Sequence, residues 1–338
     1  MNILFISYGT GIYGANSTLI ELIHNLETNY SITPIVLTPR KGKFYNYLTK
    51  NNINVVLQKW YDWVHPIDDN KTFKNRLKIV LKVVLNFYYK KIILKKIRNF
   101  ELDIIHTNTS VTDLGLFLSK KLNIPHIWYF REFLEEDYGL SFDWGKNISI
   151  RYIENYSSVI IANSLAVKKK YQNLFQKDIN VIYNAFNIQK FEQIHKYRKF
   201  NQNIINFVIV GLIHEGKNQI DAIKAVHELK DHLDNFKLYI VGDGNDQYQM
   251  LLKNYIKEND LYNHIKFVGY EEDIPKYLKN MDVGIITSKN EAFGRVTVEY
   301  MLSKMPVIGA NSGGTKEIIK HGYNGFIYEL GNYKNLKD

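Results

Sequence analysis

Short, uninterrupted apolar runs alternate with longer helical patterns along the whole chain, and the alternation restarts after a polar stretch near the middle. In the first half we predict strands at residues 3–7, 35–38, 55–58, 104–106, 126–129 and 159–162. We predict helices between them at 17–26, 44–51, 71–98, 113–122, 148–155 and 165–174, the segment 71–98 forming one or two. Continuous apolar strands separated by helices are typical of parallel sheets that are covered on both faces.

The second half repeats the pattern, with expected strands at 205–210, 237–241, 265–268, 283–286 and 307–309 and helices at 220–229, 246–259 and 296–303. A chain of 338 residues is long enough for two domains. We therefore expect an α/β fold of two Rossmann-like domains that face a cleft, with ligands at the carboxyl ends of the strands. The expected boundaries are 1–185 for the first domain, 186–202 for a linker and 203–338 for the second domain.

The composition excludes several classes of chemistry and location. The chain has no cysteine, so disulfides, thiolate zinc sites and cysteine nucleophiles are excluded, and a cytoplasmic location is expected. The first residues lack a basic region and their apolar run ends at Ser7, so we expect no signal peptide. No uncharged apolar stretch reaches about 18 residues, so we expect no membrane span.

The net charge of +10 is concentrated in one segment. Residues 71–98 hold ten Lys or Arg side chains, no acid, and many large apolar residues. One interpretation is a helix packed on the core with a basic rim. The other is a face that rests on anionic lipid, which would place the protein peripherally on the inner face of the cell membrane. No recognition motif accompanies the charge, so we expect no nucleic acid partner.

A glycine-rich loop, GTGIYG at 9–14, follows the first strand and precedes a helix. This spacing is typical of dinucleotide binding, because glycines let backbone amides approach a phosphate at a helix start. The acidic residue expected after the next strand is absent, and Pro39, Arg40 and Lys41 stand there instead. NAD is therefore disfavoured, Arg40 leaves NADP open, and a tight turn is the alternative.

Two acids, Glu291 and Glu299, border a predicted helix start at Gly294. Eight helical steps would separate their carboxylates by roughly 12 Å. This resembles the distance between the sugar and the ribose of a nucleoside diphosphate sugar. Carboxylates can accept hydrogen bonds from the hydroxyls of both groups. Amides at 294–296 and the helix dipole would hold the diphosphate. The alternative is a pair of surface glutamates.

Further glycine-containing loops follow other predicted strands of the second half. In the loop GLIHEGKN at 211–218, Lys217 is placed to reach a donor phosphate as a point charge, or to lie solvated on the surface. The segments GDG at 242–244 and GGTKE at 313–317 permit either close ligand approach or ordinary turns.

Together these segments resemble glycosyltransferase family 4, whose members are retaining enzymes with the GT-B fold. The second half matches through 211–217, VGDG at 241–244, FVG at 267–269, the two glutamates, PVIG at 306–309, GGTKE at 313–317 and NGF at 324–326. The first half matches more loosely through the 9–14 loop, DIIHTN at 103–108, IPHIWYFRE at 124–132, ANS at 162–164 and YNAF at 183–186.

The resemblance implies a role for each matching residue. Glu299 would bind the ribose, Lys217 would bind the diphosphate, and Glu291 would contact the donor sugar. Glu291 and His106 are the implied catalytic residues. The other implied donor contacts are Gly14, Gly211, Phe293, Gly294, Arg295, Val296 and, in the base pocket, Gly269. On the acceptor side the resemblance implies Asn108, Arg131 and Glu132.

The chain departs from the family pattern at three places. Leu212 stands where the family often has an arginine, and Arg295 is a candidate to compensate. Asn108 stands where the family often has a second histidine. The sequence ends at Asp338, before the helices that usually cross back to the first domain, so we expect weaker coupling between the domains.

The resemblance implies a metal-independent transferase that moves a sugar from a UDP- or GDP-linked donor to a glycan or lipid-linked acceptor, in surface polysaccharide biosynthesis. Neither a cofactor nor a metal is expected, since the donor half has no DxD pair and the adjacent Asp68 and Asp69 fit solvated surface. Retention in the family is ascribed to attack on the same face as the leaving group, with the acceptor proton passing to the phosphate. The alternatives are a non-catalytic sugar-nucleotide-binding partner and an NADP-dependent oxidoreductase.

Overall fold

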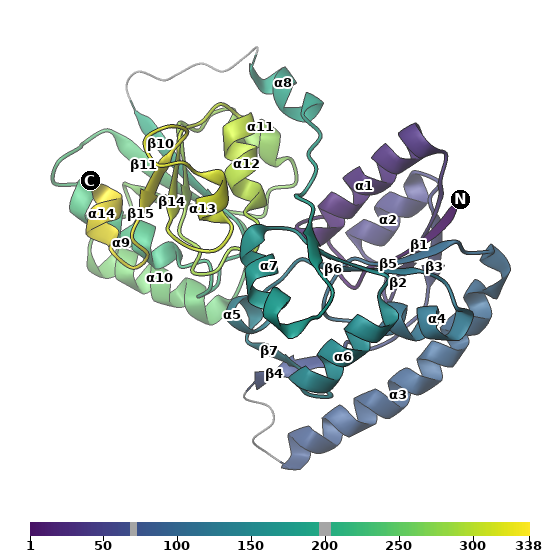
Figure 1. Ribbon diagram of the computed structural model, residues 1–338. Helices are drawn as coiled ribbons and strands as arrows, with labels where there is room; N and C mark the ends of the chain where they lie inside the picture. Colours follow the sequence, from purple (N-terminus) through teal and green to yellow (C-terminus); the bar gives the residue numbers. More distant parts are fainter. Residues whose placement is uncertain (68–72, 196–203) are drawn as a thin grey trace. The chain divides into compact units, whose positions relative to one another are not determined.

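The first half of the chain is built on a seven-stranded parallel sheet in the order β3-β2-β1-β5-β6-β8-β9 (Figure 1). The computed structural model describes residues 1–67, 73–195 and 204–338, which form two compact units, Met1–Phe186 and Asn187–Asp338. The strands of the first sheet are β1 (Asn2–Ile6), β2 (Thr33–Thr38), β3 (Asn54–Leu57), β5 (Ile104–Thr107), β6 (His126–Phe130), β8 (Val159–Ala162) and β9 (Ile179–Val181). A separate antiparallel pair joins β4 (Val64–Pro66) to β7 (Leu140–Phe142).

Helices pack on both faces of this sheet, because successive residues of a strand point to opposite sides. Phe5 of β1 packs in a cluster with α1 and α2, whereas its neighbours Leu4 and Ile6 pack with α3 and α4. The helices of the first unit are α1 (Ala15–Tyr30), α2 (Lys43–Lys50), α3 (Phe73–Ile97), α4 (Leu114–Leu122), α5 (Glu135–Tyr138), α6 (Lys146–Tyr156) and α7 (Leu165–Tyr171), with 3-10 turns at Arg98–Phe100 and Gln172–Leu174.

The second unit has a six-stranded parallel sheet in the order β12-β11-β10-β13-β14-β15. Its strands are β10 (Ile205–Val210), β11 (Phe236–Val241), β12 (Ile265–Gly269), β13 (Val283–Ile286), β14 (Val307–Ala310) and β15 (Phe326–Tyr328). Ile209 of β10 packs with α9 and α10, and Val208 packs on the other face with α11 and α12. The helices are α8 (Gln189–His195), α9 (Gln219–Leu229), α10 (Asp246–Glu258), α11 (Ile274–Leu278), α12 (Arg295–Leu302), α13 (Thr315–Ile318) and α14 (Tyr333–Lys337).

Both sheets have the strand order of a doubly wound fold, in which the chain reverses direction across the sheet at one point. That switch point lies between β1 and β5 in the first unit and between β10 and β13 in the second. The predicted pair of Rossmann-like α/β domains is confirmed at this level. Every strand expected from the sequence is present, with shifts of one or two residues at some ends.

The shortest strands were not predicted from the sequence. The strands β4, β7, β9 and β15 have three residues each, too few to show a period of two. The segment expected as a linker, 186–202, contains the helix α8, and residues 196–202 lie outside the described part of the chain. The pair Asp68 and Asp69, which we expected at the surface, is also outside it.

The basic segment forms a single helix, α3, of 25 residues. Its second half is packed on the first unit, where Ile93 and Ile97 are buried. Its first half is different, because five large apolar residues there are exposed: Phe73, Leu77, Val80, Leu81 and Val84. The interpretation of a core-packed helix therefore holds for one half of α3 only. Within the described residues, no helix is both long enough and apolar enough to span a bilayer.

Candidate functional site

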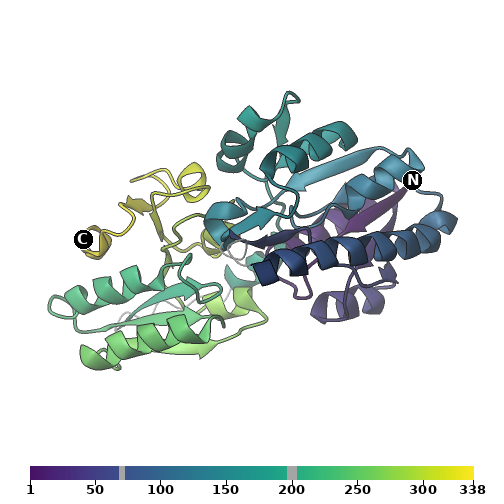
Figure 2. The same cartoon turned by 90° about the horizontal axis from the view of Figure 1, so that it is seen from below.

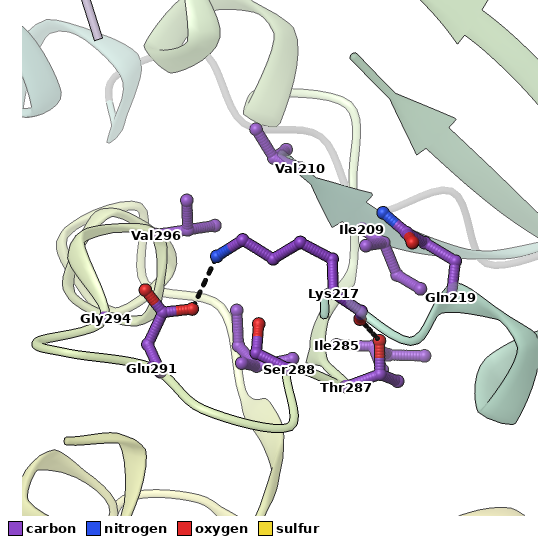
Figure 3. A pocket seen from close by; sticks show the side chains of 11 residues that line it. Ile209, Val210, Lys217, Gln219, Ile285, Thr287, Ser288, Glu291, Gly294 and Val296 are labelled. Atoms are coloured by element: carbon purple, nitrogen blue, oxygen red, sulfur yellow. Dashed lines mark hydrogen bonds and ion pairs between the residues drawn. The ribbon is translucent and has the colours of Figure 1, made fainter. Parts of the chain in front are cut away.

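A pocket opens at the switch point of the second sheet, where the loops that follow β10 and β13 approach each other (Figure 3). Lys217 comes from the loop after β10, and Glu291 from the loop after β13. Their side chains meet, with Lys217 Nζ 2.6 Å from Glu291 Oε2. Thr287 fixes the lysine loop by donating a hydrogen bond of 2.7 Å to the Lys217 carbonyl. The two predicted charges therefore lie together at the expected edge of the sheet.

The pocket is small and mixed in character. Its apolar side chains come from β10, β13 and Val296 of α12, and its polar side chains come from the loops after β10 and β13 and from Gln219 at the start of α9 (Figure 3). The residues that line it are Ile209, Val210, Lys217, Gln219, Ile285, Ile286, Thr287, Ser288, Glu291, Gly294 and Val296. A cation and a carboxylate beside a helix start provide both signs of charge to a polar ligand.

Helix α12 begins at Arg295, and Gly294 precedes it with a φ of 93°. This left-handed conformation favours glycine and turns the loop into the helix. Glu291 therefore lies in the loop before the helix. The prediction of eight helical steps between the two glutamates is wrong, since only the part from Arg295 to Glu299 is helical. The arrangement still places the first-turn amides of α12 beside the Lys217–Glu291 pair.

Glu299 lies one turn into α12, where it pairs with Arg295 at 3.3 Å, four residues before it. Its side chain is 15% exposed, and this burial raises the pKa of Glu299 above its usual value, while the Arg295 charge opposes the rise. A carboxylate that has lost water gains from a ligand that donates hydroxyl hydrogen bonds to it. Glu299 is thus suited to bind a diol such as a ribose.

The GGTKE segment packs against the backbone of the Glu291 loop. The amide of Gly314 donates a hydrogen bond of 2.6 Å to the Glu291 carbonyl. Gly313 has a φ of 45°, and a Cβ built on it would lie 2.2 Å from the same carbonyl oxygen. Only glycine fits this approach of two backbones, so the glycine pair helps to position Glu291.

The predicted positions Gly211 and Gly269 lie in a backbone network beside the pocket. The amide of Gly211 donates to the carbonyl of Val241 at 2.9 Å, and the amide of Gly242 donates to the carbonyl of Gly269 at 2.7 Å. Ile213 continues the network through a bond of 2.9 Å to Asp243. The VGDG motif therefore joins the carboxyl ends of β10, β11 and β12 into one rigid edge.

In the first unit, Arg131 is the centre of a buried polar cluster at the ends of β5 and β6. Its Nε donates to Asn108 at 2.7 Å, and one terminal nitrogen donates to Asn184 at 2.7 Å. The guanidinium lies 3.9 Å from the ring centre of Tyr129, a cation–π distance. Asn108 also donates to the Ala15 carbonyl at 3.0 Å, which connects this cluster to the start of α1.

Both oxygens of Glu132 are already bound within the unit. One accepts from the Thr109 hydroxyl at 2.7 Å, and the other accepts from the amide and the hydroxyl of Ser110 at 3.2 and 3.1 Å. The acid thus holds the loop that follows β5. Of the residues predicted on the acceptor side, Asn108, Arg131 and Glu132 are brought together by the structure.

His106 is buried on β5, between the rings of Phe5 and Tyr129. Burial, reinforced by the nearby Arg131 charge, lowers the pKa of His106 to about 3. The imidazole is therefore neutral near pH 7. The buried Nδ1 atom of His106 has no hydrogen-bond partner among the described residues, so it can still form a hydrogen bond.

The 9–14 loop is held in place by Asn16 at the beginning of α1. The Asn16 amide donates to the carbonyls of Gly9 and Gly11 at 3.0 and 2.8 Å. Gly14 precedes α1 with a φ of 53°, and its Cα is exposed with no heavy atom near a built Cβ. The loop is therefore an ordered strand-to-helix turn with an open position at Gly14.

Two family models divide the chain between them. Residues 13–190, more than half of the chain, match the model described as Glycosyltransferase Family 4. The chain belongs to glycosyltransferase family 4. Residues 190–338 match the model described as Glycosyl transferases group 1, and they contain the pocket beside α12. The resemblance inferred from the motifs is confirmed, and membership of this family supports a transferase rather than an oxidoreductase.

Curated relatives of this family 4 chain include enzymes with different acceptors. An uncharacterized glycosyltransferase of Methanocaldococcus jannaschii is 28% identical over 287 residues, which cover 81% of this chain and 73% of that protein. The N-acetyl-alpha-D-glucosaminyl L-malate synthase of Bacillus anthracis is 26% identical over 206 residues, 59% of this chain and 53% of that enzyme. An Escherichia coli UDP-Gal:alpha-D-GlcNAc-diphosphoundecaprenol alpha-1,3-galactosyltransferase is 23% identical over 259 residues, 70% of this chain and 65% of that enzyme.

Solved structures give the same fold. HepE from Anabaena in complex with UDP has a TM-score of 0.78 at 24% identity, covering 100% of this chain and 88% of that one. The apo form of the lipopolysaccharide outer core galactosyltransferase WaaB has a TM-score of 0.67 at 17% identity, with 100% and 88% covered. The two Rossmann-like units of this family 4 chain thus have the GT-B architecture.

Some of the predicted donor residues line the pocket, and others do not. Lys217, Glu291, Gly294 and Val296 line it. Six residues predicted to contact the donor are not among its lining in the described chain: Gly14, Gly211, Gly269, Phe293, Arg295 and Glu299. Phe293 is only 6% exposed and packs inward, and Leu212, where an arginine is common in family 4, is 46% exposed.

The sequence analysis did not predict three polar lining residues, Gln219, Thr287 and Ser288, or the four apolar strand residues Ile209, Val210, Ile285 and Ile286. Thr287 and Ser288 directly follow the predicted strand 283–286, so polar residues at the carboxyl end of a buried strand were the available signal. No group of three or more His, Asp or Glu side chains placed to hold a metal occurs among the residues that the structure describes.

Proposed function

We propose that this family 4 member is a retaining glycosyltransferase that moves a sugar from a UDP- or GDP-linked donor to a glycan or lipid-linked acceptor, in surface polysaccharide biosynthesis. The observation that carries the proposal is the Lys217–Glu291 pair at the start of α12. The name of the E. coli relative, with its UDP-Gal donor and diphosphoundecaprenol acceptor, supports the donor and acceptor classes. A HepE complex with UDP and glucose, at 25% identity and a TM-score of 0.76, favours UDP.

Donor binding would exchange ionic partners. A diphosphate carries more negative charge than one carboxylate, so it would take Lys217 from Glu291. The released Glu291 carboxylate would then accept hydrogen bonds from hydroxyls of the donor sugar. Glu299 would accept from the ribose, and the amides at 294–296 would contact the phosphates. The ion pairs seen without ligand would thus balance the charge of both acids until the donor arrives.

The transfer itself needs charge stabilisation on the leaving group. The bond from the anomeric carbon to the diphosphate oxygen breaks, and a bond from that carbon to the acceptor oxygen forms on the same face. The electron pair of the broken bond stays on the diphosphate oxygen, so negative charge builds up on the leaving group, and the proton of the acceptor hydroxyl passes to that diphosphate. Lys217 and the start of α12 would stabilise this charge, and we propose that the reaction requires neither a metal nor a cofactor.

Residues of the first unit would act mainly as a platform. Arg131 bonds to Asn108, and Glu132 bonds to the loop after β5. Further bonds join this cluster to Asn184 and to the start of α1. We therefore assign them a positioning role on the acceptor side. His106, being neutral, would offer a hydrogen bond to a donor or acceptor hydroxyl rather than carry a proton. Gly14 would let a phosphate approach the start of α1.

We place the reaction in the cytoplasm, at the inner face of the cell membrane. The absence of cysteine fits a reducing compartment, and a lipid-linked acceptor would be presented at a membrane surface. The exposed first half of α3 carries the charge suited to such a surface.

Turnover with a panel of UDP- and GDP-sugars tests the transferase. Release of free UDP or GDP, with an extract of bacterial membrane lipids as acceptor, is the readout. A ligand at 100 times its dissociation constant should also stabilise the fold by about 2.7 kcal/mol. We expect Glu299→Ala to abolish that stabilisation, and Glu258→Ala, an exposed acid on α10, to leave it unchanged.

Glu291→Gln separates binding from chemistry. It should retain nucleotide binding and lose turnover, because the amide leaves the Lys217 charge available to the phosphates. Binding of donors without release of nucleotide by the wild type would instead indicate a non-catalytic partner. Stabilisation by NADPH and by none of the sugar nucleotides would overturn the proposal in favour of an oxidoreductase.

A further inference from the structure

The first half of α3 presents a continuous apolar stripe to solvent. Seven large side chains are each 53–84% exposed, and Phe73 is the most exposed of them. At 3.6 residues per turn these positions fall within about 120° of the helix circumference. We call this stripe the outer face of α3; it consists of Phe73, Leu77, Val80, Leu81, Val84, Phe87 and Tyr88.

The opposite side of α3 is anchored to the body of its unit. Lys82 bonds to Asp143 at 2.8 Å and to Asp62 at 3.0 Å, and Asn86 bonds to the backbone of Tyr61 at 2.7 and 2.9 Å. Lys90 pairs with Asp113 at 2.5 Å. These anchors lie on the side of the helix away from the stripe. The outer face therefore points away from the unit.

Figure 2 shows α3 running across one side of its unit, with no other helix of that unit laid over it. A stripe of this size normally costs free energy in water and indicates a docking surface. The anchors show that α3 is a fixed part of the fold and not a frayed segment. The outer face is therefore a preformed surface.

Basic side chains surround the outer face and continue it. Lys74 and Arg76 are exposed at its two edges. Towards the end of the helix, Lys91, Lys95 and Arg98 are exposed on the same side as the stripe. Residues 71–98 contain no acid, so the positive charge of this surface is uncompensated along its own helix.

The charge pattern decides between the possible occupants. The apolar positions follow steps of four and three residues, as in a coiled coil, which would suit a second copy of the chain. Pairing two such helices would bring Lys and Arg against Lys and Arg, which opposes self-association. A surface of anionic phospholipid satisfies both features, since its acyl boundary accepts the apolar stripe and its headgroups attract the basic edges.

We propose that the outer face of α3 docks on an anionic phospholipid surface, with its axis parallel to the membrane plane. Phe73, Leu77 and Val84 would enter the boundary between headgroups and acyl chains. Lys74, Lys91 and Lys95 would lie among the headgroup phosphates. This docking does not depend on the transfer reaction, because it uses none of the residues around the pocket of the second unit.

Co-sedimentation with vesicles tests the docking on the full chain without any donor. The wild type should bind vesicles that contain phosphatidylglycerol, bind pure phosphatidylcholine weakly, and dissociate as salt is raised. Leu77→Ser combined with Val84→Ser should weaken binding roughly tenfold or more. Lys91→Gln combined with Lys95→Gln should weaken it roughly twenty-five-fold, at about fivefold per charge.

Matched controls lie in the second unit. Met250→Ser with Leu251→Ser removes two exposed apolar side chains from α10, and Lys237→Gln with Lys257→Gln removes two exposed charges. Both should bind vesicles like the wild type. Equal binding by the α3 variants, or no binding by the wild type, would overturn the proposal. A wild-type dimer in sedimentation velocity that Leu77→Ser and Val84→Ser convert to a monomer would assign the stripe to self-association instead.

Discussion

At the scale of single residues, the site is defined by two ion pairs that a ligand would have to rearrange. Lys217 is bound to Glu291 at 2.6 Å, and Arg295 is bound to Glu299 at 3.3 Å. All four side chains are less than 30% exposed, so their charges interact more strongly than surface pairs do. The family pattern assigns the lysine and the glutamates to the donor, and the structure adds that each is paired before the donor binds.

The raised pKa of Glu299 leads to a pH dependence. Because burial favours the protonated carboxyl, Glu299 takes up a proton at a higher pH than an exposed glutamate does. A protonated acid accepts hydroxyl hydrogen bonds poorly, so the affinity for UDP-glucose should fall as the pH is lowered towards the raised pKa of Glu299. Titration calorimetry measures this fall, and UDP-glucose is suitable because its esterified phosphates do not titrate there.

Glu299→Gln is the matched control for this titration. Its affinity should be lower than that of the wild type at neutral pH and nearly independent of pH over the same range. A wild-type affinity that does not change with pH, or a variant that retains the full pH dependence, would show that another group is responsible.

Gly313 is the residue at which backbone packing fixes the position of Glu291. A Cβ at Gly313 would lie 2.2 Å from the Glu291 carbonyl oxygen, whereas one at Gly322 would meet nothing within 4 Å. Both glycines have a positive φ, 45° and 75°, so Gly322→Ala carries the conformational strain without the clash. We expect Gly313→Ala to lower the free energy of unfolding by roughly 1–3 kcal/mol more than Gly322→Ala. Urea unfolding of the two variants measures the difference, and equal losses would contradict the packing role.

At the scale of elements, the contacts that fix the start of α12 and one side of α3 determine which of their residues are exposed. Helix α12 begins where Gly294 turns the loop, which places Glu291 outside the helix and Glu299 inside it. Helix α3 is held along one side by polar contacts in its middle and by apolar contacts near its end. In each helix, contacts with the rest of the unit fix one part, and this determines which residues face the pocket in α12 and which face solvent in α3.

The anchoring of α3 can be tested with two lysines one turn apart. Lys82→Met leaves Asp143, whose side chain is 1% exposed, without its closest cation. We expect a loss of roughly 3 kcal/mol in the free energy of unfolding. Lys78→Met, at an exposed position of the same helix, should change it by less than about 0.5 kcal/mol. Similar effects of the two substitutions in urea unfolding would show that the Lys82 pairs do not anchor the helix.

At the scale of the whole molecule, hydrophobic periodicity was enough to predict two doubly wound units. Buried parallel strands such as β1 and β10 are continuous apolar runs that contrast with the helices beside them. Strands of three residues, such as β9 and β15, cannot show a period and owe their conformation to pairing with neighbours. Motif spacing identified Lys217 and Glu291, but not that they pair with each other, since that contact joins residues 74 positions apart. The loop geometry before α12 could not be predicted from the sequence either, because it depends on how Gly294 lies against the side chains of Glu291 and Ile318.

A crystal structure of the protein with UDP bound tests the central claim most directly. We predict that the diphosphate contacts Lys217 Nζ and the first amides of α12, that the ribose hydroxyls lie on Glu299, and that the 2.6 Å contact between Lys217 and Glu291 is broken. A complex in which UDP lies elsewhere, with the Lys217–Glu291 and Arg295–Glu299 pairs both intact, would contradict the assignment of this pocket to the donor.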